Sequence, residues 1–494
     1  MAQVIILTGS LYVEDTIPRL HRTLGAYRVA SALMQSGYSV QVIDYIQYMS
    51  DDELIKCIEN YLCEETLWVG YSSTFFGMHM NINTDLDKMY FLNTEKLNRV
   101  ISYVKNNSEA KIVYGGAYAI DRHYDSRVDY YVAGYADVSC VELTNFLANK
   151  TESLTHYQVL QNNCVLIDSA KYQEPPLANI NTNWDHESFH LIPGEPISLE
   201  FARGCIFKCK FCNYPLLGKK KGTYIRDMNQ VKDELISLWE KTGTDTFYIT
   251  DDTFNDDNDK MENFHKLFTS LPFKPKFASF LRIDLIDRYP HQADLLLEAG
   301  LVGAFFGVES FNLKSARSIG KGLHPEKVKN RLSWIKEKWS GKANIGVGLI
   351  IGLPYDDDNY FRELEEYVTS KDYPIDQTSF NPLWIADPKR GTNVYSSEFS
   401  LNPEIYGYSF DENGHWIHDS GLTFEHAKMI SYHFSTLVSD KVKPADFQVI
   451  SNLALGIKLE DIVSLDYASL YSTYDIPKMN KEKIDTYKMM IGAV

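Results

Sequence analysis

Short apolar runs and amphipathic stretches alternate over the first 150 residues of the chain. Strand-like runs occur at residues 4–8, 39–44, 67–73, 111–116 and 128–134. A helical pattern that starts at Tyr27 and is closed by Gly37 separates the first two runs. Strands followed by helices at this rhythm form a parallel sheet with helices on both faces. The pattern predicts an α/β domain at residues 1–150, with a doubly wound parallel sheet of the flavodoxin or Rossmann type.

A second alternation begins near residue 196, after a segment at residues 151–195 that lacks clear periodicity and is interpreted as a connector. Six apolar runs follow, at residues 197–201, 246–250, 276–281, 301–309, 343–352 and 375–385. Helical patterns such as residues 230–243 separate them. Six strand and helix units of this length fit a partial TIM-type barrel, (β/α)6, at residues 196–385. Polar residues gather where these strands end, and barrel enzymes place their chemistry at that edge.

Residues 386–494 lose this alternation and are predicted to form a mainly helical C-terminal extension. Its clearest helix covers residues 423–438, with Thr423 as the N-cap. Four histidines without a tight metal-ligand pattern lie here, namely His415, His418, His426 and His433. Such histidines are expected to be ordinary packing and surface residues. The alternative is that the extension forms a lid over the barrel.

The composition indicates a globular protein with a net negative charge. The 494 residues are 44% hydrophobic and 23% charged, and the net charge is −17. An acidic surface repels phosphate backbones, so nucleic acid and anionic membranes are not expected partners. The first residues, MAQVIILTGS, contain no basic region and too short an apolar run for a signal peptide or a membrane span. We expect a cytoplasmic protein in which the basic run at residues 218–222 is a solvated loop, or alternatively a phosphate clamp.

The segment RGCIFKCKFCN, residues 203–213, contains three of the seven cysteines and follows the first predicted barrel strand. The other four lie singly and are expected to be buried small apolar residues; they are Cys57, Cys63, Cys140 and Cys164. A structural zinc site needs four protein ligands, and the nearest histidines, His190 and His265, lie at no familiar offset. Three cysteines in a CxxxCxxC pattern fit a [4Fe–4S] cluster whose fourth iron is open. A zinc site and a cluster with a fourth protein ligand are the alternatives.

The pattern Cys-x3-Cys-x-aromatic-Cys, met here by Cys205, Cys209, Phe211 and Cys212, resembles the signature of the radical SAM superfamily. The resemblance implies that the three cysteines are metal ligands of a [4Fe–4S] cluster and that Phe211 belongs to the S-adenosylmethionine (SAM) site. It implies that the amino and carboxylate groups of SAM bind the fourth iron. The reduced cluster would then split SAM to methionine and a 5′-deoxyadenosyl radical, which abstracts a hydrogen from an unactivated carbon.

Two later segments resemble the parts of this superfamily that bind the methionine end of SAM. The segment ITDDTFN, residues 249–255, resembles the one that receives the SAM amino group, with Asp251 and Asp252 as candidates. Arg282, at the end of FASFLR, is the candidate for the SAM carboxylate. A guanidinium group pairs with a carboxylate through two parallel hydrogen bonds.

Two further segments resemble the strand ends that contact the adenosine end of SAM. The segment GVES resembles the strand end that contacts the ribose, which gives Glu309 and Ser310 as candidates. The segment GLIIGLP resembles the strand whose glycine, here Gly352, allows backbone to approach the adenine closely.

An α/β domain placed before such a barrel resembles the subfamily of radical SAM enzymes with an N-terminal cobalamin-binding domain. Members carry a Ser-x-Leu/Thr segment after one strand and a Gly-Gly pair after another, and the pair lets backbone pass the nucleotide tail of cobalamin. Ser72 and Thr74 occupy the first position, and Gly115 and Gly116 occupy the second. The resemblance implies cobalamin as a further cofactor that contacts these four residues.

One motif of this subfamily is altered. Many members carry Asp-x-His-x-x-Gly after the first strand, and the histidine binds cobalt. The segment RLHRTLG has Arg19 at the Asp position and one residue too many between His21 and Gly25. This departure argues against a histidine ligand to cobalt. Two alternatives follow, cobalamin bound without that ligand or a domain that has kept the fold without the cofactor.

The sequence therefore predicts a radical SAM enzyme that cleaves SAM reductively to start hydrogen abstraction, with cobalamin-dependent C-methylation as the more specific hypothesis. The alternative is a non-catalytic iron–sulfur sensor or electron-transfer protein. No cysteine follows Cys212, so a second, C-terminal cluster is not expected. The expected partners are a small-molecule or lipid-like substrate and a low-potential electron donor. The sequence does not identify the substrate.

Overall fold

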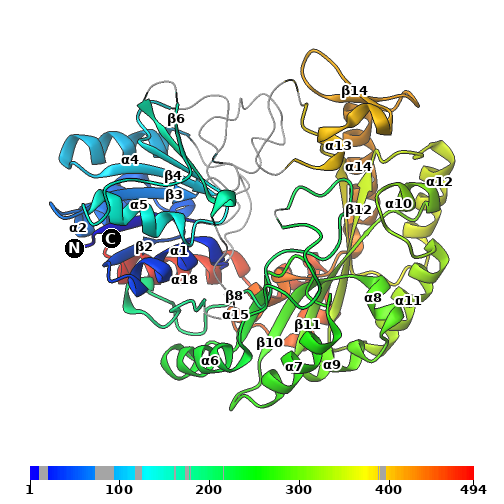
Figure 1. Ribbon diagram of the computed structural model, residues 1–494. Coiled ribbons are helices and arrows are strands. Elements are labelled where there is room, and N and C mark those ends of the chain that lie inside the picture. Colours follow the sequence, from blue (N-terminus) through cyan, green and yellow to red (C-terminus); the bar gives the residue numbers. More distant parts are fainter. Residues whose placement is uncertain are drawn as a thin grey trace. The chain divides into compact units, whose positions relative to one another are not determined.

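The chain forms two compact units (Figure 1). The computed structural model describes residues 1–9, 20–72, 94–116, 119, 125–160, 163–172, 177, 180–214, 216–387, 389 and 396–494. The first unit comprises residues 1–198, 229–244 and 477–494, and the second comprises residues 199–228 and 245–476. None of the helices in the described residues combines the length and the apolar character that crossing a membrane requires. The division into residues 1–150, 151–195, 196–385 and 386–494 that the sequence indicates stays a prediction.

The first unit is built on a seven-stranded sheet with the order β2-β1-β3-β4-β5-β7-β6. Its strands are β1 (Val4–Leu7), β2 (Val40–Ile43), β3 (Trp68–Ser72), β4 (Lys111–Gly116), β5 (Tyr130–Ala133), β6 (Tyr157–Val159) and β7 (Val165–Asp168). All neighbours pair in parallel except β6, which runs antiparallel to β7. The five predicted strands and their parallel pairing are confirmed. The sequence pattern misses β6 and β7, which lie in the segment interpreted as a connector; they have only three and four residues and show no clear periodicity.

The helices of the first unit begin and end at recognisable signals. They are α1 (Leu24–Gln35), α2 (Asp51–Tyr61), α4 (Thr94–Asn107), α5 (Ser139–Leu147), most of α6 (Met228–Thr242) and most of α18 (Ile476–Met490). Gly37 follows the end of α1 with a φ of +85°, a conformation that glycine adopts without strain. α2 begins at a capping box, in which the Ser50 and Glu53 side chains each accept from the other residue's backbone N–H.

A buried ion pair joins distant segments of the first unit. Arg22 Nε donates to Glu195 Oε1 at 2.6 Å, and both side chains are 0% exposed. Arg22 Nη1 donates to Tyr27 Oη at 2.6 Å, and the guanidinium also donates to both carbonyls of residues 189–190. The Tyr45 hydroxyl donates to the same Glu195 oxygen. Because the buried guanidinium has acceptors on all three nitrogens, its desolvation is offset.

The same cluster includes the last helix of the chain. Tyr27 Oη donates to Asp44 Oδ2 at 2.6 Å, and the Asp44 backbone N–H donates to Tyr487 Oη at 2.8 Å. The Arg22 guanidinium lies 5.0 Å from the centroid of the Tyr487 ring, within the range of a cation–π contact. The cluster thus holds α1, the segment after β2, α18 and the segment before β8 at one point.

The second unit contains most of a six-stranded sheet with the order β13-β12-β11-β10-β9-β8. Its strands are β8 (Ile197–Leu199), β9 (Thr246–Ile249), β10 (Lys276–Leu281), β11 (Leu301–Glu309), β12 (Asn344–Ile351) and β13 (Gln377–Pro382). Strands β9 to β13 pair in parallel. β8 joins at Leu199, whose carbonyl accepts from the Thr250 N–H at 2.7 Å. The predicted partial (β/α)6 barrel is confirmed.

Helices cover the outer side of this curved sheet, as Figure 1 shows for α7 to α12. The helices are α7 (Asn258–Thr269), α8 (Ile283–Arg288), α9 (Gln292–Glu298), α10 (Leu313–Ser318), α11 (Pro325–Lys338) and α12 (Asp358–Thr369). Their apolar faces meet the sheet; Phe306 of β11 stacks on Trp339 at the end of α11, with ring centroids 6.3 Å apart.

The C-terminal extension is mainly helical, as predicted. Its elements in the second unit are α13 (Glu398–Leu401), the hairpin of β14 (Tyr408–Phe410) and β15 (Trp416–His418), α14 (Phe424–Val438), α15 (Phe447–Ala454), α16 (Leu459–Ser464) and α17 (Tyr467–Thr473). Thr423 caps α14 by accepting from the His426 N–H. α15 packs against β9, β10 and β11. A Cβ on Gly303 would lie 3.1 Å from the Asp446 backbone, so the extension closes on the sheet near the amino ends of its strands.

We predict that Arg22→Met lowers the free energy of unfolding by about 3 to 5 kcal/mol, because Glu195 would keep a buried charge without its partner. Urea unfolding followed by circular dichroism measures the change. Arg99→Met is the matched control, since Arg99 pairs with Asp51 at the surface with 54% of its side chain exposed. Equal unfolding midpoints for the two variants would contradict an anchoring role of Arg22.

Candidate active site

The cysteine loop, residues 203–218, follows β8 and contains a glycine that the backbone requires. Gly204 has a φ of +79°, and a Cβ there would lie 2.7 Å from the carbonyl oxygen of Leu216. Across the loop, the Cys205 N–H donates to that oxygen at 3.2 Å and the Gly218 N–H donates to Phe207 O at 3.0 Å. The loop therefore folds back on itself, although its described residues form no helix or strand.

Each cysteine sulfur of the loop lies beside a hydrogen-bonding group. The contacts are Thr253 Oγ1 with Cys205 Sγ at 3.3 Å, Arg282 Nη1 with Cys209 Sγ at 3.5 Å, and the Tyr214 backbone N–H with Cys212. Burial raises the pKa of the Cys205 thiol. Burial, with added repulsion from Cys209, Asp252 and Cys205, raises the pKa of the Cys212 thiol to about 12. Metal-bound thiolates are stabilised by such donors.

All three cysteines are free thiols. Within the described ranges, no three side chains of His, Cys, Asp or Glu are arranged to hold one metal ion. A multi-iron cluster makes a different demand, because each thiolate binds a different iron. Three thiols in one loop, two of them in buried surroundings that disfavour an unpartnered thiolate, are a donor set that fits such a cluster.

Asp251 is committed to the fold. Its Oδ1 accepts from the Phe201 N–H at 2.7 Å, and its Oδ2 accepts from Lys260 Nζ at 3.2 Å. Lys260 also lies 2.6 Å from Asp256, and Lys219 Nζ lies 3.7 Å from the same Asp256. The Lys219 side chain is 2% exposed, so the expected solvated loop is wrong for this residue. This charge chain fixes the end of the cysteine loop to the segment after β9.

Asp252 differs from its neighbour. Its buried Oδ2 has no hydrogen-bond partner among the described residues. Burial raises the pKa of Asp252 to about 7, and repulsion from Asp251 and Glu200 adds to the shift. A buried polar atom without a partner is costly unless a ligand satisfies it. Of the two predicted acids, the structure therefore leaves Asp252 available to a ligand.

The other predicted SAM residues of the barrel lie at carboxyl ends of strands, and most have protein partners. Arg282, after β10, pairs with Asp284 at 2.9 Å. Glu309, at the end of β11, has a φ of +70°, and its carboxylate lies 3.4 Å from Lys321 Nζ. Another candidate, Phe211, is half-buried within the cysteine loop. Their roles toward SAM stay predictions.

Ser310 and Gly352 are also integrated into the protein. Ser310 Oγ donates to Tyr360 Oη at 3.2 Å. Gly352 has a φ of +102°, and a Cβ there would lie 2.6 Å from the Trp416 ring. The Gly352 N–H donates to Asp356 at 3.0 Å, and its carbonyl accepts from Tyr408 Oη at 2.8 Å. The β14–β15 hairpin thus supplies a structural reason for this glycine at the carboxyl end of β12.

The candidates of the first unit meet at neighbouring strand ends. Ser72 at the end of β3 is the cross-strand partner of Gly115 near the end of β4. Among the described residues, the atom nearest to a Cβ on Gly115 would be the Val132 carbonyl oxygen at 3.6 Å, and Gly116 has a φ of +121° that favours glycine. Thr74 lies outside the described residues. Carboxyl ends of parallel strands are where such sheets bind ligands.

Sequence reasoning missed several residues that shape the barrel site. Thr253 Oγ1 lies 3.3 Å from Cys205 Sγ, and Asp284 forms an ion pair with Arg282 at 2.9 Å. Both missed residues therefore contact residues that the sequence predicted. Thr253 lies inside the ITDDTFN segment, so a search for donors near the cysteines could have found it. Lys260 carries no sequence signal, because a lysine on an amphipathic helix is usually exposed.

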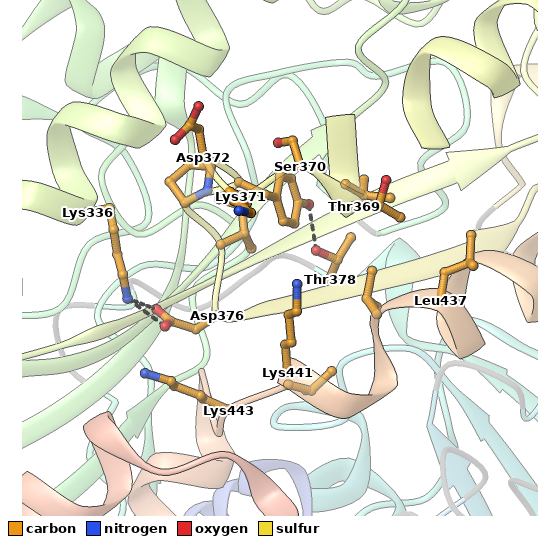
Figure 2. A pocket seen from close by; sticks show the side chains of 16 residues that line it. Lys336, Thr369, Ser370, Lys371, Asp372, Asp376, Thr378, Leu437, Lys441 and Lys443 are labelled. Atoms are coloured by element: carbon orange, nitrogen blue, oxygen red, sulfur yellow. Dashed lines mark hydrogen bonds and ion pairs between the residues drawn. The ribbon is translucent and has the colours of Figure 1, made fainter. Parts of the chain in front are cut away.

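A separate hollow of about 460 Å3 lies elsewhere in the second unit (Figure 2). Lys336 and Asp376 form an ion pair of 2.5 Å on its wall, and the Thr378 hydroxyl is hydrogen-bonded to the Tyr373 hydroxyl at 2.6 Å. The hollow is lined by the loop that precedes β13, at the amino ends of the parallel strands. The cysteine loop follows the carboxyl end of β8, so this hollow is not part of the cysteine site.

Comparisons with known proteins agree with this arrangement. Residues 199–368 match the radical SAM superfamily. The cytidylyl-2-hydroxyethylphosphonate methyltransferase of Streptomyces wedmorensis is 23% identical over 437 residues, which cover 75% of this chain and 76% of that protein.

Two solved structures share the fold over nearly the whole chain. The radical S-adenosylmethionine methyltransferase TsrM from Kitasatospora setae, with cobalamin and a [4Fe–4S] cluster bound, has a TM-score of 0.63 at 15% identity, covering 98% of this chain and 100% of that one. The cobalamin-dependent S-adenosylmethionine radical enzyme OxsB, with aqua-cobalamin bound, has a TM-score of 0.56 at 14% identity, covering 99% of this chain and 72% of that one. The similarity establishes the fold of both units.

Proposed function

The chain belongs to the radical SAM superfamily through residues 199–368, and we propose that it is a cobalamin-dependent methyltransferase that acts on a carbon atom of a small molecule. The observation that carries the proposal is the placement of three free thiols after the first barrel strand of a chain that also contains the N-terminal sheet. Both relatives named as methyltransferases, the curated protein and TsrM, support the methyl-transfer part.

The cysteine loop would hold the [4Fe–4S] cluster through Cys205, Cys209 and Cys212. No fourth cysteine follows in the chain, which leaves one iron for SAM. When bound, the cluster and SAM supply one-electron reductive cleavage of SAM, and cobalamin supplies a carrier for a methyl group. The protein's part is to bind and orient these groups and to exclude water.

Asp252 is the residue that we propose for the SAM ammonium group. Its buried Oδ2 lacks a partner, and an ammonium group would supply both the hydrogen bond and the opposite charge. Phe211, Glu309, Ser310 and Gly352 are proposed around the rest of SAM. The Arg282 fork is already paired with Asp284, so the predicted contact with the SAM carboxylate competes with an internal partner.

The strand ends of β3 and β4 are proposed to receive cobalamin, with Ser72, Gly115 and Gly116 next to it and Thr74 as the further candidate. The absence of side chains at Gly115 and Gly116 supports this placement, because backbone without a side chain allows close approach. His21 is followed by Arg22, whose side chain is buried in the ion pair with Glu195. We propose that cobalamin binds without a histidine ligand from this segment.

The substrate is proposed to be a small molecule, and the electron donor a low-potential one. The curated relative is named for cytidylyl-2-hydroxyethylphosphonate, which is a small molecule, and this name supports the class without specifying the compound here. A net charge of −17 disfavours nucleic acid as the substrate.

We predict that Asp252→Asn weakens SAM binding at least tenfold, because a charge-assisted hydrogen bond contributes about 1.5 to 3 kcal/mol. Equilibrium dialysis with labelled SAM on the cluster-loaded protein measures it. Asp251→Asn is the matched variant and should instead lower the free energy of unfolding by about 3 kcal/mol, because Asp251 is bonded to Lys260 and Phe201. Wild-type SAM affinity in Asp252→Asn would remove this residue from the SAM site.

We predict that the cluster-loaded enzyme, given SAM, a chemical reductant and cobalamin, forms 5′-deoxyadenosine, and forms S-adenosylhomocysteine only when cobalamin is present. Mass spectrometry quantifies both products. Cys209→Ala should abolish both, since the cluster would lose one of its three thiolates. S-adenosylhomocysteine formed equally without cobalamin, or full activity in Cys209→Ala, would refute the proposed function.

A further inference from the structure

The guanidinium of Arg282 is fixed on three sides. Nε and Nη2 donate to the two Asp284 oxygens at 3.0 and 2.9 Å. The guanidinium carbon lies 3.6 Å from the ring centroid of Phe207, which belongs to the cysteine loop. The third nitrogen, Nη1, donates to Cys209 Sγ at 3.5 Å. With only 6% of the residue exposed, this orientation is set by protein contacts.

The backbone of Arg282 is fixed as firmly as its side chain. The Arg282 N–H donates to Asn255 Oδ1 at 2.9 Å, and Asn255 Nδ2 donates to the Arg282 carbonyl at 3.1 Å. Asn255 is itself buried and bonded to Gln292. The arginine is therefore held at the cysteine loop before any ligand is present.

We propose that Arg282 is a positioning residue for the iron–sulfur cluster, which holds the Cys209 thiolate through a charge-assisted N–H···S hydrogen bond and makes the reduction potential of the cluster less negative. The inference rests on the proposed function, because it needs a cluster bound through Cys209. It assigns to Arg282 a partner other than the SAM carboxylate that the sequence predicted.

The physical reason is the charge that reduction adds. One electron makes the cluster and its thiolates more negative, and a nearby cation stabilises the reduced form more than the oxidised form. The groups beside the other two sulfurs, the Thr253 hydroxyl and the Tyr214 backbone N–H, are neutral. Arg282 therefore brings the positive end of its ion pair with Asp284 to Cys209, because Nη1 contacts the sulfur directly while Asp284 binds Nε and Nη2.

Asp284 makes this arrangement possible. Its two hydrogen bonds take the Nε and Nη2 side of the planar fork and leave Nη1 aimed at the sulfur. A lysine could carry the charge, but it has no planar fork to be held in two places at once. The stacked Phe207 ring restricts rotation of the group out of this plane.

The test is a redox titration of the cluster-loaded protein without oxygen, in which the electron paramagnetic resonance signal of the reduced cluster is followed against potential. Arg282→Met should shift the midpoint potential to a more negative value, and Arg282→Lys should give a smaller shift in the same direction. Arg331→Gln is the matched control, because Arg331 forms an equivalent ion pair with Asp287 at 2.8 Å between α11 and α8. Its potential should equal that of the wild type.

SAM affinity, measured by equilibrium dialysis on the same samples, separates the two roles of Arg282. The inference expects a shifted potential in Arg282→Met with SAM affinity changed less than about threefold, under 1 kcal/mol. An unchanged potential overturns it, and a large loss of SAM affinity at unchanged potential assigns Arg282 to the SAM carboxylate instead.

Asp284→Asn provides a second route, since it keeps the guanidinium and removes the carboxylate that offsets its charge. It should shift the potential to a less negative value even if the Arg282 variants fail to load iron, and a wild-type or more negative potential in a cluster-loaded Asp284→Asn overturns the inference. Failure of the proposed function looks different, because the wild type itself would then hold no cluster or would not cleave SAM.

Discussion

The buried charge chain from Lys219 through Asp256 and Lys260 to Asp251 is the constraint on which the barrel site depends. The part of the cysteine loop that the structure describes forms no helix or strand, and burial raises the pKa of its Cys205 and Cys212 thiols. These ion pairs hold the cysteine loop at both ends. Asp251 accepts from the backbone N–H of Phe201, between β8 and the loop, and Lys219, directly after the loop, pairs with Asp256. Such a network is stable only when each ion keeps its partners, so it also specifies one geometry for the loop.

Both candidate sites use the same physical principle. In each unit, parallel strands end at one edge, and turns that follow them can place backbone and polar groups without breaking the sheet. The C-terminal extension contributes buried contacts to each of the two units. In the first unit, Tyr487 of α18 packs in the Arg22 cluster, and in the second, Trp416 of the β14–β15 hairpin packs against the Gly352 turn. These contacts give the C-terminal extension a structural role that does not depend on its four histidines.

The sequence was informative where the signal is local. The cysteine spacing, the six barrel strands and the Thr423 cap depend on residues a few positions apart. Which side chains form ion pairs and hydrogen bonds was not predictable, because these contacts join distant segments. Arg22 and Glu195, for example, are 173 residues apart in the sequence. Asp251 and Asp252 are adjacent and identical in type, yet only the folded strand end decides which of them meets Lys260. The pairing of Arg282 with Asp284 is local, but the choice between that partner and a ligand needs the geometry.

The proposed function requires that three thiolates of one loop bind three irons of a cluster and that the fourth iron binds SAM. Mössbauer spectroscopy of protein loaded with 57Fe, recorded before and after SAM is added, measures this. We expect one of the four irons to change its environment when SAM binds and the other three to stay unchanged. If all four irons are unaffected in protein shown to bind SAM, the proposed function is wrong.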